Sequence, residues 1–137
     1  MKLVHFDDVE LENVDIEGAK NTKIRWLVAQ KDGAPNFAMR MFEVKKDGHT
    51  PYHTHDWEHE IFVLEGEGVL VLKDEEKPFK QWDIMYIDPN MEHRFKNTGK
   101  GLLRFLCIIP HESNYKTERK NTDEALNPFA SGIANNC

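Results

Sequence analysis

The stretch His53-Thr54-His55-Asp56-Trp57-Glu58-His59 holds three of the seven histidines in this chain, and Gly66 follows the last of them after six residues. His53 and His55 are two residues apart, so on a β-strand their side chains project from the same face. His93 follows some 40 residues later, with Asn97 after it. Imidazole is a ligand for Zn, Fe, Mn, Ni and Cu. The spacing therefore predicts one metal ion held by histidines from separate strands.

Two less specific readings stand beside this one. A short His-x-His pattern has a high false-positive rate as a metal motif, because single histidines are common at surfaces and in satisfied cores. Four ligands in a closed tetrahedron would instead make a structural zinc site without an open position. The rest of the sequence helps to choose among a chance pattern, a structural zinc site and an open metal site.

The rest of the chain is typical of an all-β domain. Short runs rich in β-branched and aromatic residues alternate with turn clusters such as Asp47-Gly48 and Gly66-Glu67-Gly68. No helical period competes with them, and no internal repeat is evident. The predicted strands are Ile24–Ala29, Phe37–Val44, Tyr52–His55, Glu60–Leu64, Val69–Lys73, Ile84–Ile87, Arg94–Lys96 and Leu102–Ile109.

Together these features resemble the small single-domain cupins of the RmlC-like superfamily. The first cupin motif corresponds to Gly48, His53, His55, His59 and Gly66, and the second to Trp82, Asp88, Asn90, His93 and Asn97. Residues 34–40, 57–64 and 105–110 look like the four-histidine, manganese-binding members. The resemblance implies a double-stranded β-helix, a jelly-roll barrel or sandwich with few or no helices. It also implies metal ligation by His53, His55, His59 and His93.

The resemblance divides the chain into three parts. Residues 1–23 form an N-terminal extension that could add an exchanged strand to a partner subunit. Residues 24–110 form the cupin domain, and residues 111–137 form a polar C-terminal tail.

The chain departs from the family pattern at several positions. Four residues instead of five separate Gly48 from His53, and Asp88 replaces the usual Pro. Trp82 replaces the usual Gly, and Asn90 replaces another Gly at a turn where Asn tolerates a positive φ. The usual glutamate ligand aligns with His59 by one spacing and with Glu60 by the other. Only His59 has Gly66 at the correct distance, so we expect His59 to be the ligand.

Strand alternation suggests which side chains line a pocket. In Leu102–Ile109 it places Phe105, Cys107 and Ile109 on the inner face, and Ile61 is a further expected pocket residue. Cys107 is either a buried packing residue or a neighbour of the metal ligands. Arg40 either reaches into the pocket to pair with a substrate carboxylate or extends to the barrel rim.

Two acidic residues flank the third histidine. Glu58 and Glu60 are either acceptors for a ligating histidine's second nitrogen or solvated charges. Arg40 and Cys107 are the candidates for a catalytic role, and no residue is evident as an independent general base.

Composition excludes some functions. A net charge of -6 and a pI near 5.6 argue against a nucleic-acid partner. No segment has the apolar length of a membrane span or of a signal peptide. With only Cys107 and Cys137, a disulfide framework is not expected, and the reducing cytoplasm is the expected location.

The resulting hypothesis is a homodimeric, metal-dependent enzyme acting on a small molecule. Four neutral imidazoles leave a divalent ion with its full charge of about +2, which attracts anionic or enolisable oxygens. We expect Mn or Fe, with Zn, Ni or Cu as alternatives, and oxidoreductase chemistry of the dioxygenase type. The alternatives are a non-catalytic sensor or storage cupin and a cupin isomerase. The choice rests on analogy, since one fold hosts many functions.

Overall fold

The computed structural model describes residues 1–111 and Cys137. Its regular elements are nine strands and two short 3-10 turns, and no α-helix occurs in the described part of the chain, which confirms the all-β prediction. The turns are η1 (Phe6–Asp8) and η2 (Gln30–Asp32), and the strands are β1 (Glu12–Asn13), β2 (Lys20–Val28), β3 (Phe37–His49), β4 (His59–Glu65), β5 (Glu67–Val71), β6 (Glu76–Lys80), β7 (Ile84–Ile87), β8 (Arg94–Asn97) and β9 (Leu103–Pro110).

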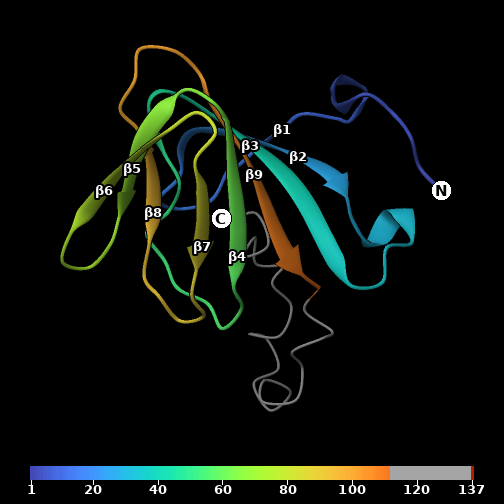
Figure 1. Cartoon of the computed structure of the whole chain (residues 1–137). Helices are drawn as coiled ribbons and strands as arrows, with labels where there is room; N and C mark the ends of the chain where they lie inside the picture. Colours follow the sequence, from blue (N-terminus) through green and yellow to red (C-terminus); the bar gives the residue numbers. More distant parts are fainter. Residues whose placement is uncertain (112–136) are drawn as a thin grey trace.

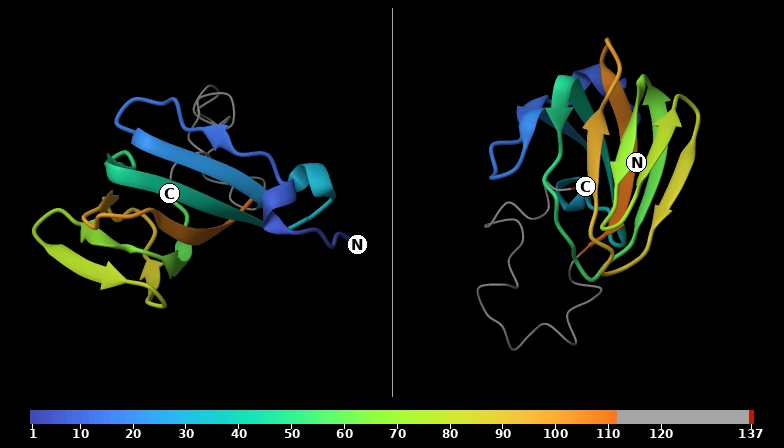
Figure 2. Two further views of the ribbon diagram at one scale, coloured as in Figure 1. Left: turned by 90° about the horizontal axis from the view of Figure 1, so that it is seen from above. Right: turned by 90° about the vertical axis from the view of Figure 1, so that its left-hand side faces the viewer.

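The strands form one curled antiparallel sheet with the order β6-β5-β8-β3-β9-β4-β7, and β2 pairs with β3 on a side branch that also holds β1. β3 connects the two halves of the curl, because it pairs with β9 along residues 37–44 and with Lys96 of β8 at His49. The inner faces of the two halves therefore oppose each other (Figures 1 and 2). This is the jelly-roll arrangement expected from the sequence.

The core fills the space between these inner faces. β9 alternates buried and partly buried residues along its whole length, as predicted, so that Leu103, Phe105, Cys107 and Ile109 face inward. Phe105 lies between Phe42 and Phe95, with ring centroids 5.4 and 4.9 Å away. Burying such large aromatic surfaces stabilises the barrel without a metal.

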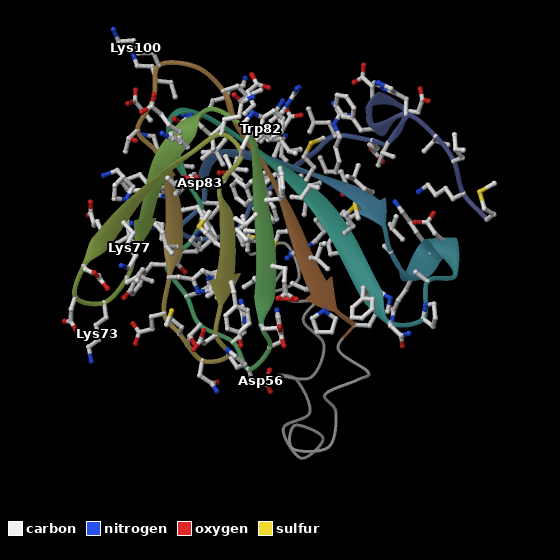
Figure 3. The ribbon with its side chains drawn as sticks, in the orientation of Figure 1. Asp56, Lys73, Lys77, Trp82, Asp83 and Lys100 are labelled. Atoms are coloured by element: carbon white, nitrogen blue, oxygen red, sulfur yellow. The ribbon has the colours of Figure 1, made fainter. Side chains whose placement is uncertain are left out.

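The turns at the two ends of the barrel explain two departures from the family motif. Trp82, in the turn between β6 and β7, has φ 76°, and Asn90 has φ 67°. Both residues adopt the left-handed conformation that the usual Gly would adopt without strain. Figure 3 shows Trp82 and Asp83 at one end of the barrel and Asp56, in the loop between β3 and β4, at the other.

Three sequence predictions about local structure were wrong. Residues 52–55 do not form a strand, because only His53 makes an isolated bridge, to His93. β6 (Glu76–Lys80) has no counterpart among the predicted strands. The turn predicted at Asp47-Gly48 lies within β3, which continues to His49. The first residues of the chain lead to η1, where His5 Nδ1 accepts a hydrogen bond from the Asp7 amide, and the exchanged strand stays a prediction.

The N-terminal residues pack on their own chain. β1 pairs with β2, and the Arg25 guanidinium donates to the Val9 carbonyl while lying 5.3 Å from the Phe6 ring centroid. β2 begins at Lys20, so the sheet starts before residue 24. Nothing in the described part of the chain is a helix long and apolar enough to cross a bilayer.

Candidate metal centre

The four histidines of the motif come from three different segments. His53 and His55 lie in the loop between β3 and β4, His59 begins β4, and His93 immediately precedes β8. His53 and His93 exchange backbone hydrogen bonds of 3.1 and 3.0 Å, which join the two loops at the mouth of the barrel. The Asn90 amide also donates to the His55 carbonyl at 2.7 Å. The backbone thus positions these rings before any ligand binds.

The four side chains converge on one point. One ring nitrogen from each of the four histidines lies within 4.8 Å of the others. His59 and His93 are fully buried, while His53 and His55 are partly buried. The His59 ring stands edge-on to those of His55 and His93, with centroid separations of 4.3 and 5.1 Å. This arrangement is the one that the sequence predicts for the metal ligands.

The second nitrogen of each ring shows how the protons are placed. Nδ1 of His53, His55 and His93 lies 2.9, 2.9 and 2.7 Å from the carbonyl oxygens of Pro51, Trp57 and Met91. A carbonyl oxygen only accepts, so each Nδ1 carries the proton and donates. In a neutral imidazole the other nitrogen, Nε2, then presents a lone pair, which is the state that binds a metal.

His59 has a different partner. Its Nδ1 lies 2.9 Å from the sulfur of Cys107, and Arg40 donates from Nη2 to the same sulfur at 2.9 Å. Arg40 is fully buried, with its guanidinium 5.2 Å from the Phe42 ring centroid. Of the two positions considered from the sequence, the structure therefore has Arg40 inside the barrel and not at its rim. Cys107 lies directly behind a candidate ligand.

Burial sets the charge state of the cluster. It lowers the pKa of His53 to about 4 and that of His55 to about 3, and it lowers the pKa values of His59 and His93 as well. All four rings are therefore neutral at pH 7. Burial raises the pKa of Cys107, but a hydrogen bond from Cys137 and the charge of Arg40 outweigh it, so that the net shift is downward.

These observations fit a bound cation. His53 Nε2 is buried and has no hydrogen-bond partner among the described residues, which is costly for a polar atom unless a ligand satisfies it. His55 Nε2 and His59 Nε2 approach to 2.5 Å. Four lone pairs directed at one buried point suit a divalent transition metal.

The two glutamates lie elsewhere. Glu60 is exposed on the opposite face of β4 from His59, as strand alternation requires. Burial and a hydrogen bond to Glu58 raise the pKa of the Glu60 carboxyl. The described partners of the four Nδ1 atoms are three carbonyls and one sulfur, so neither glutamate accepts a hydrogen bond from Nδ1 of these histidines, which was one of the two alternatives for Glu58 and Glu60.

The expected pocket residues and one unexpected residue share the inner face. Ile61, Phe105 and Ile109 are all buried there, and Ile61 pairs directly with Cys107 across β4 and β9. Cys137 is also fully buried, and its backbone oxygen lies 2.9 Å from His93 Nε2. Sequence reasoning missed Cys137, because no motif or periodicity connects the end of the polar tail to the barrel interior.

Comparison with known proteins agrees with this geometry. The cupin domain model matches residues 40–109, which is half of the chain, and the protein therefore belongs to the cupin family.

The relatives differ in activity. The polyketide cyclase RemF from Streptomyces resistomycificus has 41% sequence identity and a TM-score of 0.76, with 80% of this chain and 79% of RemF covered. L-ectoine synthase of Shouchella clausii is 30% identical over 115 residues, which is 80% of each chain. The oxalate-binding protein of Thermotoga maritima is 38% identical over 58 residues, 42% of this chain. The chain spans 48% of that protein and 57% of another curated relative.

Proposed function

We propose that this cupin is a metal-dependent enzyme that binds a small organic substrate through two of its oxygens, with ring closure of a poly-carbonyl chain as the reaction. The observation that carries the proposal is the convergence of His53, His55, His59 and His93, whose ring nitrogens lie within 4.8 Å of one another while their Nδ1 atoms contact three carbonyl oxygens and the Cys107 sulfur. A bound divalent ion would supply Lewis-acid polarisation of a carbonyl oxygen.

The nature of the reaction is inferred from the relative with the highest identity reported above. RemF is a polyketide cyclase, and its similarity extends over most of both chains. A polyketide chain carries alternating carbonyl groups, which can present two oxygens to one centre. The full positive charge left by four neutral imidazoles favours the enolate form of such a chain.

The residues of the chain have distinct roles in this proposal. The four histidines hold the ion, and the apolar walls Ile61, Phe105 and Ile109 exclude water and position the carbon chain. The Arg40 guanidinium, held against the Cys107 sulfur, is the candidate cation for an anionic substrate oxygen. We assign no independent general base.

The test begins with elemental analysis of protein purified without added metal. Mn or Fe is the expected ion, with Zn, Ni and Cu as alternatives. The protein is then incubated with a linear poly-β-ketone, and we expect an aromatic absorbance and a product lighter by one water, without oxygen consumption. The His53→Ala/His55→Ala double variant is the control and should be inactive. Oxygen uptake in proportion to product would instead support the dioxygenase chemistry expected from the sequence.

A second candidate function follows from a separate comparison. The oxalate-binding protein of Thermotoga maritima is 38% identical to this chain over 58 residues. Oxalate offers two carboxylate oxygens to a metal, so binding without turnover would make this protein a ligand-binding cupin. Calorimetric titration of the metal-loaded protein with oxalate, followed by product analysis, distinguishes the two. Tight binding with unchanged oxalate and no ring closure of the poly-β-ketone would favour the binding module.

A further inference from the structure

Cys137 reaches the candidate metal centre from a part of the chain far from the cupin motifs. It is fully buried, and its backbone oxygen lies 2.9 Å from Nε2 of His93. Figures 1 and 2 show this end of the chain within the curl of the sheet. The contact joins residues 44 positions apart.

Proton accounting shows that this contact is not an ordinary hydrogen bond. His93 Nδ1 lies 2.7 Å from the Met91 carbonyl oxygen and must donate to it. The neutral imidazole that binds a metal has only one N–H, so Nε2 faces Cys137 with a lone pair. The backbone oxygen of Cys137 also offers only lone pairs. Two acceptors at this distance repel each other unless a cation lies against both.

The distance matches two ligands of one ion. Metal–nitrogen and metal–oxygen bonds in protein sites are about 2.0–2.2 Å long, so two neighbouring ligands at a right angle lie about 3 Å apart. The observed 2.9 Å between His93 Nε2 and the Cys137 oxygen agrees with this geometry. We propose that the backbone oxygen of Cys137 is a fifth ligand of the metal ion, beside the four histidines.

A second contact holds Cys137 in place. Ligand atoms of Cys107, Cys137 and His59 lie within 4.8 Å of one another, so the Cys137 thiol lies close to the Cys107 thiol inside the barrel. The residue is thus fixed from both sides, by its thiol against Cys107 and by its backbone oxygen against His93. This anchoring lowers the entropic cost of a ligand that comes from a distant segment.

The proposal rests on the proposed function, because it needs a metal at the four-histidine centre, and it changes how a substrate would bind. A six-coordinate ion with five protein ligands has one open position, so a substrate with two donor oxygens must displace Cys137. Loss of the bond between the ion and the Cys137 oxygen would then indicate that substrate has bound. An oxygen ligand also favours Mn, Fe or Zn over the softer Cu(I).

The experiment uses protein labelled with [1-¹³C]cysteine and loaded with Mn²⁺, studied by electron-nuclear double resonance. The only two labelled carbons belong to Cys107 and Cys137. We expect a ¹³C coupling from a carbon about 3 Å from the ion, since a carbonyl carbon lies one bond beyond its coordinating oxygen. The coupling should persist in labelled Cys107→Ser protein.

The matched control is the labelled Cys137→Ala variant, which keeps a backbone oxygen but leaves the label only at Cys107, so the coupling should vanish. Imidazole ¹⁴N couplings without any ¹³C coupling in the wild type would overturn the fifth ligand and leave the four-histidine site intact. Absence of both couplings, with Mn²⁺ free in solution, would overturn the metal site and the fifth ligand together.

Discussion

The imidazole Nδ1 of His59 lies 2.9 Å from the sulfur of Cys107, and the two residues belong to neighbouring strands. The other three histidines of the cluster direct Nδ1 to carbonyl oxygens of their own loops. His59 is therefore oriented by the tertiary structure, and the others by local backbone. This difference makes His59 the ligand most sensitive to a change in the core.

Replacing Cys107 tests that dependence. In Cys107→Val the side chain keeps its approximate volume but loses the acceptor for His59 Nδ1, so we expect metal affinity to fall about 10- to 100-fold. Cys107→Ser keeps an acceptor and should lose less. Metal titration by calorimetry measures the affinity, and thermal unfolding of the metal-free variants identifies any loss that comes from packing alone. Equal metal affinities for the Val variant, the Ser variant and the wild type would show that Cys107 contributes only packing.

A second prediction concerns the two alignments of the first motif. His59 is buried at the centre, whereas Glu60 points outward from the next position of β4. His59→Ala should lower metal affinity by a large factor, and Glu60→Gln should change it little. His59→Glu should keep the ion while lowering the charge of the site by one, which weakens azide binding. Metal loss in Glu60→Gln but not in His59→Ala would contradict the four-histidine site.

The lowered histidine pKa values predict how the metal-free protein responds to acid. Burial holds the folded-state pKa of His53 near 4 and that of His55 near 3, below the ordinary value of 6.5. The unfolded chain therefore binds more protons below pH 6.5, and stability falls as the pH drops from there toward 4. The slope is at most about 1.4 kcal/mol per pH unit for each histidine.

Urea unfolding of the metal-free protein at a series of pH values measures this slope. The variant His53→Gln, which removes one of the titrating groups, should show a shallower dependence between pH 6.5 and pH 4. A free energy of unfolding that does not change between pH 6.5 and pH 4 in the wild type would show that folding does not lower the pKa values of these histidines.

Trp82 gives a prediction about backbone strain. It has φ 76° and is 64% exposed, and its described ring contact is with Phe62, 6.0 Å between centroids. Both Trp82→Gly and Trp82→Ala lose that contact, but only Gly adopts a positive φ without strain. We expect the Gly variant to be about 1 kcal/mol more stable than the Ala variant by urea unfolding. An Ala variant of equal or higher stability would exclude strain at this turn.

The sequence predicted the barrel and the four histidines because both depend on short-range patterns. Alternation identified the inward face of β9, and the distance from His59 to Gly66 selected His59 over Glu60. Gly66 has φ 86°, and a Cβ there would lie 2.4 Å from the Leu102 carbonyl oxygen. Only Gly fits this turn, so its place in the sequence fixes the spacing from which the ligand is counted.

Other features depend on contacts that no local pattern records. β6 was hidden by the acidic residues before it, since a turn and an exposed edge strand have similar composition. The acceptors for His53 and His93 are backbone carbonyls two residues earlier in each loop, and these cannot be read from side-chain types. The contact of Cys137 with His93 links segments whose meeting depends on the whole fold.

The backbone bridge between His53 and His93 has a consequence for how the ion would be loaded. Because hydrogen bonds of 3.1 and 3.0 Å already hold the two loops together, loading the centre requires no refolding of the chain. Binding energy is then not consumed in ordering the loops, in contrast to small metal-dependent domains that unfold when the ion is removed. We expect the metal-free protein to stay folded, so that the identity of the bound metal follows which ions are available around it.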